Sequence, residues 1–490
     1  MALGEVDYGL MGLVGGLTVL ITFANSLMAN AVGRFFAYSV GQSQVNGVEG
    51  LEICRRWFNI ALFLHSIIAV VGLAVGYPIG AWAIRNFLTI PAGRVEDCIW
   101  IWRIVCAGGV LGMVSVPFNA MYGAKQYIAE LTIYTFVTST LNACFLYYMV
   151  THPGLWLVKL SLWSFLLGLA PMLIIAFRAV KLFPECRFVP RYMIDAARTR
   201  ELFVYASYRF FGALAIMIKG QGMAILVNKF LGPAKNAAMA IGGAVSGQCN
   251  NMSSALLSAL SPAITNAYGA GQMERVKKLS YAACRVSAVM ALVFVLPLLL
   301  EADEVFRLWL KTPPEGAVEI CRYYMGVLVF ENMTCGLYVP IFADGRIRGY
   351  QMSCLLTAPI CILIAVAFLV YGFDVESIGC ALLFGQLAVV VIRLYFTRII
   401  CGFDSGVWIN RIAIPILLCS FVALLAALPV VHFMKSSLVR VVVTTSVVNA
   451  VFVPLVWRFV LDETERLILR EKIVNRISWW RTPRLPRGNR

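Results

Sequence analysis

Residues 117–127, PFNAMYGAKQY, return 223 positions later as residues 340–350, PIFADGRIRGY. Each segment follows a long apolar stretch, and the two share a proline, an alanine, a cation and a tyrosine at the same spacing. Repetition at a nearly fixed offset indicates an internal duplication. Further matches occur in the same order along the chain: Leu3-Gly4 with Leu231-Gly232, Gly41-Gln42 with Gly271-Gln272, Cys54-Arg55 with Cys284-Arg285, and residues 91–98 with 314–321.

The composition around these segments excludes a soluble globular protein. Hydrophobic residues make up 60% of the 490 positions, and charged residues only 13%. A soluble domain has no interior large enough for that much apolar surface, whereas a bilayer accepts it on helices whose backbone hydrogen bonds are all internal. The sequence therefore predicts an all-α, polytopic membrane protein.

Apolar windows of roughly 20 residues mark the spans, because that length crosses the hydrocarbon core. Thirteen such windows are present, five before residue 180 and eight after residue 202. They are residues 9–32, 57–84, 99–122, 128–150, 154–179, 203–228, 237–266, 279–300, 318–342, 351–371, 376–400, 409–432 and 437–460.

Lysine and arginine in successive connections alternate in number, with 27 on one side and 8 on the other. The richer side is predicted to be cytoplasmic. It includes Arg34, Lys125, Arg393, Arg411 and the basic tail. The C-terminus is then cytoplasmic, and an odd number of spans starts the chain outside. We expect the native or ancestral chain to have a fourteenth helix ahead of Met1.

Each repeat offset crosses six spans, so matching helices run in the same direction. This predicts two parallel six-helix lobes followed by a final helix pair. The predicted divisions are an N-terminal lobe with its cytoplasmic connection (1–200), a C-terminal lobe (201–402), the last two helices (403–460) and a basic amphipathic cytoplasmic tail (461–490).

The repeated segments resemble those of the multidrug/oligosaccharidyl-lipid/polysaccharide exporter superfamily, and within it the bacterial polysaccharide (O-antigen-type) flippases. The resemblance covers roughly residues 1–400. Its motifs are LGEVDYGLMGL (3–13), LGPAKNAAMAI (231–241), AYGAGQMERVKKL (267–279) and the two proline-to-tyrosine connections. It implies a V-shaped pair of lobes that open alternately to the two sides of the membrane. If the first helix of that pattern is missing ahead of Met1, as we expect, the chain departs from it there.

Polar side chains inside predicted spans are the candidates for cargo binding, because their burial in a membrane is costly. Cations neutralise a phosphate, and amides donate to and accept from sugar hydroxyls. Ordinary alternatives are snorkelling for the arginines and interhelical hydrogen bonds for the amides. The candidates are Lys219, Gln221, Arg209, Gln248, Asn250, Asn251, Asn25, Asn30 and Arg34.

Glu331 is the candidate for ion coupling, since a mid-span carboxyl is able to bind a proton or sodium ion. A neutral buried glutamic acid, or one paired with Arg322 or Lys219, is an equal alternative. No metal site or cofactor is expected, because the three histidines are far apart and the fourteen cysteines form no CxxC pair.

These features favour a flippase for lipid-linked oligosaccharide or polysaccharide precursors in the cytoplasmic (inner) membrane. The alternative is a multidrug efflux antiporter coupled to protons or sodium, and an enzyme is not expected. Expected partners are an undecaprenyl-pyrophosphate-type glycan lipid, membrane lipids and a glycan polymerase or glycosyltransferases. Nucleic acid is excluded because the cations lie in the short connections and the tail.

Overall fold

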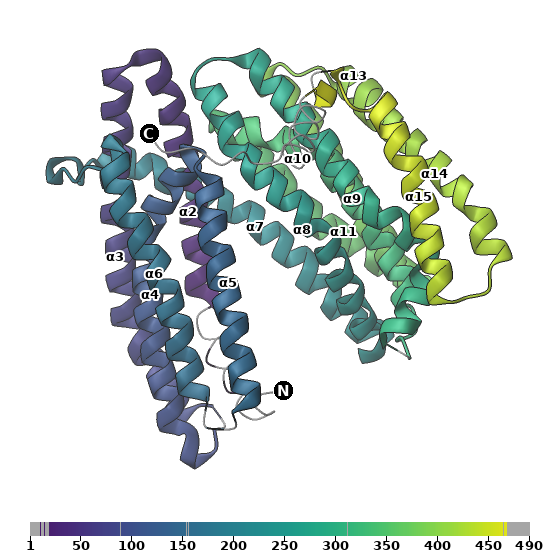
Figure 1. Cartoon of the computed structure of the whole chain (residues 1–490), viewed down its shortest axis with the longest axis horizontal. Helices are drawn as coiled ribbons and strands as arrows, with labels where there is room; N and C mark the ends of the chain where they lie inside the picture. The colour runs from purple at the N-terminus through teal and green to yellow at the C-terminus, as the bar shows by residue number, and fades with distance from the viewer. Residues whose placement is uncertain are drawn as a thin grey trace, which may run out of the picture. The chain divides into compact units, whose positions relative to one another are not determined.

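A computed structural model describes residues 19–467, apart from Thr89, Pro153, Leu155, Lys311 and Thr464, together with Leu10 and Val14. Every regular element in this part of the chain is helical (Figure 1), which confirms the predicted all-α class. The motif at residues 3–13 and the tail beyond residue 467 lie largely outside the described residues.

The helices follow one another with short connections. In the first part of the chain they are α2 (Val19–Asn46), α3 (Val48–Asn86), α4 (Val95–Ala124), α5 (Ile128–Thr151) and α6 (Leu157–Leu182), with short 3₁₀ turns at Ala92–Arg94, Pro184–Cys186 and Pro190–Tyr192. Those that follow are α7 (Ala196–Leu231), α8 (Pro233–Gly269), α9 (Met273–Leu310), α10 (Ala317–Asp344), α11 (Arg348–Val370), α12 (Val375–Cys401), α13 (Ser405–Trp408), a π-helical turn (Ile409–Ala413), α14 (Ile414–Phe433) and α15 (Leu438–Phe459).

Eleven helices of the described chain are long and apolar enough to cross a membrane, if α13, the π-helical turn and α14 count as one. The other two long helices, α2 and α8, have 28 and 37 residues. Together they agree with the predicted count of about thirteen, and the protein is a multi-pass membrane protein. The helices α2 and α8 are the glycine-rich pair that the sequence repeat matches with each other.

Several helices are longer than their predicted spans. The predicted span 9–32 ends fourteen residues before the end of α2 at Asn46, where Gly47 takes a positive φ of 55° and starts a new helix. At 1.5 Å per residue the 39 residues of α3 measure about 58 Å, nearly twice the hydrocarbon thickness. Hydropathy finds only the part of a helix that lies in lipid, so the polar extensions were missed.

The chain divides into two compact units. Unit 1 contains Met1–Phe211, Ser261–Val276 and Phe342–Arg348; unit 2 contains Gly212–Leu260, Lys277–Ile341 and Gly349–Arg490. In unit 1, α3 packs on α4, α4 packs on α6, and α2 packs on both α3 and α4. The indole of Trp102 fits against Gly80, where a Cβ atom would lie 2.3 Å from the ring. By contrast α5 has few contacts with α4 and α6.

The connection between α6 and α7 folds back along α3 in unit 1. Asn59 donates to the backbone carbonyl of Arg187 and accepts from the backbone N–H of Val189. Asp195 then caps α7 by accepting from the backbone N–H of Arg198. This bond, together with a second one from the Arg198 guanidinium, holds the pKa of the Asp195 carboxyl below its usual value. The loop is therefore an ordered part of unit 1.

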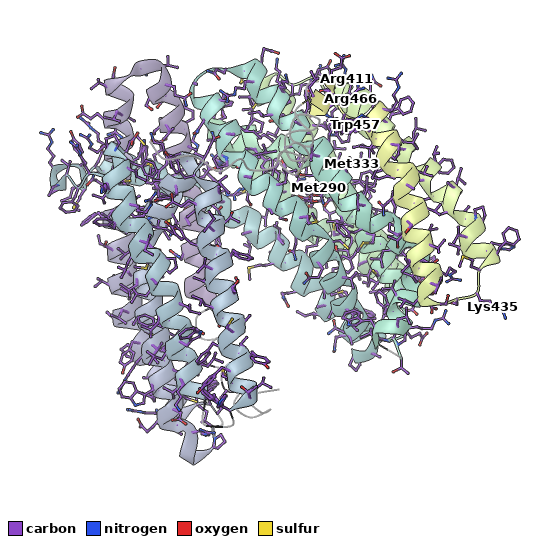
Figure 2. The ribbon with its side chains drawn as sticks, in the orientation of Figure 1. Met290, Met333, Arg411, Lys435, Trp457 and Arg466 are labelled. Atoms are coloured by element: carbon purple, nitrogen blue, oxygen red, sulfur yellow. The ribbon has the colours of Figure 1, made fainter. Side chains whose placement is uncertain are left out.

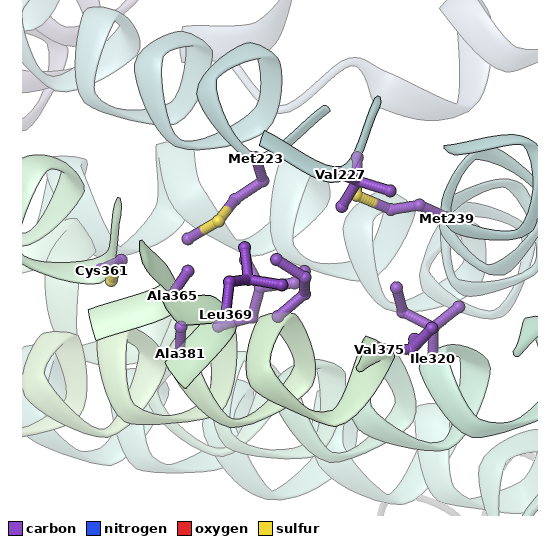
Figure 3. Packing of buried hydrophobic residues seen from close by; sticks show 11 residues of the cluster. Met223, Val227, Met239, Ile320, Cys361, Ala365, Leu369, Val375 and Ala381 are labelled. Carbon is purple, nitrogen blue, oxygen red and sulfur yellow. The ribbon is translucent and has the colours of Figure 1, made fainter. Parts of the chain in front are cut away.

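In unit 2 the helices α7, α8, α10, α11 and α12 share an apolar cluster (Figure 3). Figure 3 shows Met223 and Val227 of α7 turned toward Ala365 and Leu369 of α11. Small residues permit close approach here, as at Gly385, where a Cβ atom would lie 2.1 Å from the sulfur of Cys361. Close van der Waals contact of this kind holds helices together in lipid, where the hydrophobic effect contributes little between them.

The last helix pair is anchored to α9 by ion pairs at both ends of α15. Near one end, Arg440 pairs with Glu301 at 2.8 Å, and Glu301 is 1% exposed. Near the other, Arg285 pairs with Asp462 at 2.6 Å and with Glu465 at 2.7 Å. Figure 2 shows Arg411 and Arg466 at one end of the pair and Lys435 at the opposite end, as their alternation in the sequence predicts.

Candidate functional site

A polar cluster lies between α10 and α12 inside unit 2. The Oε1 atom of Glu331 pairs with Nη2 of Arg393 at 2.8 Å. Its Oε2 atom accepts from Nε2 of Gln386 at 2.9 Å. The guanidinium also donates to Oγ1 of Thr334 at 2.8 Å and lies 5.0 Å from the ring centre of Tyr338. An acid on α10 and a base on α12 thus join the two helices within the membrane-spanning part of the chain.

Arg393 corrects the sequence interpretation, which counted it among cytoplasmic loop cations. It lies within α12, eight residues before the helix ends at Cys401, and it is 6% exposed. The carboxylate and hydroxyl partners offset the cost of burying its charge. The sequence does not reveal these partners, so a cation near the end of an apolar window was assigned to the connection that follows. Its acid, Glu331, retains 35% side-chain exposure, so one face of the carboxylate is accessible.

Lys219 lies on the face of α7 that is turned toward α11. That face also carries Gly212, where a Cβ atom would clash with Gln351, and the buried Met223. Its positive charge acts on Glu331 and on the α11 thiols. Among the described residues no carboxylate forms an ion pair with Lys219. Glu331, Arg393 and Lys219 thus bring two basic side chains and one acidic side chain to this region of unit 2.

The amide candidates on α8 divide into two groups. Asn250 accepts from Nδ2 of Asn332 at 3.1 Å, which places it beside the Glu331 turn of α10, and it donates to Ser254. Asn251 and Gln248 are exposed and bond to each other at 2.9 Å. Gln221 is also exposed, two positions round α7 from Lys219. Among the amide candidates on the described helices, Asn250 is the one that a hydrogen bond joins to α10, at the residue after Glu331.

The candidates Arg34 and Arg209 lie in unit 1 and meet at the end of α10. Arg34 donates from Nη2 to the carbonyl of Ala343 at 2.7 Å and from Nε to that of Phe342 at 3.2 Å. Arg209 lies 4.1 Å over the ring of Phe342. Cations at a helix C-terminus stabilise its negative dipole end and its unpaired carbonyls. Both arginines therefore hold a helix end in this conformation.

A corresponding bond runs from the second half of the chain to the first. Asn266, near the end of α8, donates to the carbonyl of Ala124 at the end of α4 at 2.9 Å. The sequence repeat matches α2 with α8 and α4 with α10. The two bonds correspond: α2 bonds the end of α10, and α8 bonds the end of α4. Asn266 was not singled out in the sequence, since nothing in its spacing marks it.

The two asparagine candidates of α2 differ in their contacts. Asn30 is exposed and donates to the carbonyl of Ser26. Asn25 lines a cavity of about 340 Å³ between α2, α3 and α4, and its Oδ1 atom has no hydrogen-bond partner in the described structure. Across the described residues no group of three histidine, cysteine or acidic side chains is placed to hold a metal ion.

The chain was compared with known proteins by sequence and by fold. No family model matches the chain, and no curated protein matches its sequence. Solved structures do match its coordinates. The chain has the MATE transporter fold. A MATE crystal structure in a bent conformation matches with a TM-score of 0.68 at 15% identity, covering 82% of this chain and 88% of that one.

Two other structures with the MATE fold match over the same 82% of this chain. An outward-facing multidrug-resistance MATE transporter of the MOP superfamily has a TM-score of 0.66 at 15% identity, with 89% of its length covered. A MOP superfamily transporter from Pyrococcus furiosus, described as having a binding pocket of reversed polarity, has a TM-score of 0.65 at 15% identity, with 91% covered. These likenesses establish the fold that the repeat predicted.

Proposed function

We propose that the chain is a transporter that works by alternating access and flips lipid-linked oligosaccharide or polysaccharide precursors across the membrane. The observation that carries this proposal is the charge of the cluster in unit 2. Arg393 already neutralises Glu331, so the charge of Lys219 is left for an anion. A phosphate or pyrophosphate head is the anionic part of such a cargo, and Asn250 adds an amide beside it.

The same cluster argues against export of organic cations, the alternative function. A cationic drug needs a carboxylate that is free to pair with it. Glu331 is held by Arg393 and Gln386 instead. We keep Glu331 as the candidate for ion coupling: a coupling cation at this carboxylate has to compete with the guanidinium, so coupling requires Arg393 to move.

The expected setting follows from the sequence. The charge distribution favours the cytoplasmic membrane with the C-terminus inside, where anionic lipids meet the basic tail. A glycan polymerase or glycosyltransferases are the partners that such cargo requires. We assign no catalytic residue.

Lys219 provides the test. The full-length protein is reconstituted in liposomes, and the movement of a fluorescent undecaprenyl-pyrophosphate-linked sugar between leaflets is measured. Lys219→Ala is expected to reduce the rate at least about tenfold, a loss of roughly 1.4 kcal/mol of interaction, and Lys219→Arg is expected to retain most of it. Lys229→Ala, at the exposed end of the same helix, is the matched control. Equal rates in Lys219→Ala and Lys229→Ala would contradict the proposal.

A further inference from the structure

Unit 1 contains a cavity that none of the candidate residues lines. It has a volume of about 530 Å³ and lies between α4, α5 and α6. That volume is within the usual range for sites that bind small molecules. No charged side chain lines it, which separates it from the cationic cluster of unit 2.

The lining is rich in oxygen atoms that accept hydrogen bonds. Thr135 and Thr138 donate their hydroxyl protons to carbonyls within α5, and Ser115 donates to the carbonyl of Gly112 within α4. The amide nitrogen of Asn119 is bonded to Ser115. Because these donors are used inside their own helices, the free capacity that faces the cavity consists mainly of acceptor lone pairs. A ligand that donates hydrogen bonds fits this lining, and the Ser164 hydroxyl adds a group that both donates and accepts.

The glycines of the lining keep the space open. A Cβ atom added at Gly112 or Gly168 would meet nothing within 4 Å, and one added at Gly108 would touch the Phe165 ring at 3.4 Å. Glycine at these spacings usually marks close contact between membrane helices. Here the neighbouring helix leaves room beside Gly112 and Gly168, so the GxxxG pair at Gly108 and Gly112 does not serve packing alone.

The polar residues of α5 indicate that water and polar ligands are able to reach this cavity. Thr132, Thr135, Ser139 and Asn142 recur at intervals of three or four residues, which places them on one face of the helix. Opposite positions such as Val137 and Leu141 are apolar and exposed. A polar stripe on a loosely packed membrane helix is costly against lipid, so it indicates a water-filled side.

From these features we infer that the cavity between α4, α5 and α6 is a binding subsite for a neutral, hydroxyl-rich group, namely a sugar ring. Sugar hydroxyls donate to the acceptor oxygens, and the Phe165 ring supplies an apolar face for the C–H side of the ring. The pyrophosphate diester of a glycan lipid has no proton to donate at neutral pH and finds no cation in the lining. The role of this subsite in transport rests on the proposed glycan-lipid function.

The test uses the full-length protein in nanodiscs and two glycine variants. Gly168→Leu places a side chain in this cavity, since Gly168 lines it and does not line the cavity beside Asn25. Gly123→Leu is the control, because its Cβ also meets open space but lies outside the lining. Leucine favours helix over glycine, so both variants are expected to fold, and equal melting temperatures verify this. The probes are dodecyl maltoside, which carries a neutral disaccharide, and undecaprenyl pyrophosphate with and without a disaccharide.

We expect Gly168→Leu to bind dodecyl maltoside at least about tenfold more weakly than wild type, with Gly123→Leu unchanged. We also expect Gly168→Leu to weaken binding of the glycosylated lipid while leaving the sugar-free lipid unaffected. Equal maltoside binding in all three proteins would overturn the subsite, as would equal weakening of both pyrophosphate lipids. Failure of the wild type to bind either pyrophosphate lipid would instead refute the proposed function, and the maltoside result would still decide the subsite.

Discussion

Gly41 of α2 and Gly269 of α8 face each other's helix in a reciprocal contact. A Cβ atom at Gly41 would lie 2.0 Å from the carbonyl oxygen of Asn266, and one at Gly269 would lie 2.2 Å from that of Tyr38. The two contacting pairs are related by one offset, since Tyr38 and Gly41 are each 228 residues from Asn266 and Gly269. The crossing therefore has local two-fold symmetry, as a duplicated chain predicts.

Replacing either glycine by a larger residue is expected to lower the stability of the protein. In Gly41→Val the added atoms meet backbone, which cannot rotate away as a side chain can, so the helices must separate. Overpacking of this kind costs about 1–3 kcal/mol. Thermal unfolding in detergent should show a lower melting temperature for Gly41→Val and for Gly269→Val. Gly33→Ala on the same α2 helix, where the Cβ meets open space, should melt like the wild type; equal melting of all the variants would contradict the crossing.

The pair of Glu331 and Arg393 gives a second prediction. Arg393→Met removes the cation from a carboxylate inside the bundle and is expected to destabilise by about 3–5 kcal/mol. The double variant Arg393→Met with Glu331→Gln should recover much of that loss, because no unpaired charge remains. Urea unfolding of the purified proteins measures both. Arg398→Met, on the exposed side of α12, is the control. A single variant no less stable than the double would show that the pair is not formed.

A third prediction concerns the attachment of the C-terminal segment. Arg285 is 3% exposed and binds Asp462 and Glu465. Arg285→Met should release the chain after α15 and expose it to limited proteolysis near Arg466, several-fold faster than in the wild type. Arg275→Met at the start of α9, where the guanidinium bonds Gln272, provides the comparison. If cleavage rates near Arg466 are unchanged by Arg285→Met, the attachment does not exist in solution.

Hydropathy and charge alternation were sufficient to predict an all-α membrane protein with about thirteen spans, because lipid-facing surface has to be apolar along the whole crossing. They were not sufficient for helix ends such as Asn46, which project beyond the bilayer. The repeat indicated which helices correspond, and the reciprocal contact at Gly41 and Gly269 joins two of those helices.

The site was harder to predict than the fold. Lys219, Asn250 and Glu331 were found because they are polar residues in apolar windows, and the structure brings them to one region of unit 2. Arg393 was missed because its partner is 62 residues away and only the fold brings α10 and α12 together. Arg34 and Arg209 were found for the same reason as Lys219, yet their visible contacts are with a helix end. One sequence does not distinguish a cation that binds a ligand from one that caps a helix.

The function itself is tested most directly by transport in a defined system. Wild-type protein is reconstituted in liposomes that contain fluorescent undecaprenyl-pyrophosphate-linked disaccharide, and a membrane-impermeant quencher reports which leaflet holds the label. The same vesicles are loaded with a fluorescent organic cation to test drug export. We predict rapid exchange of the glycan lipid between leaflets, far above protein-free vesicles, and no movement of the cation. Export of the cation under a proton or sodium gradient, with the glycan lipid remaining in its original leaflet, would contradict the account.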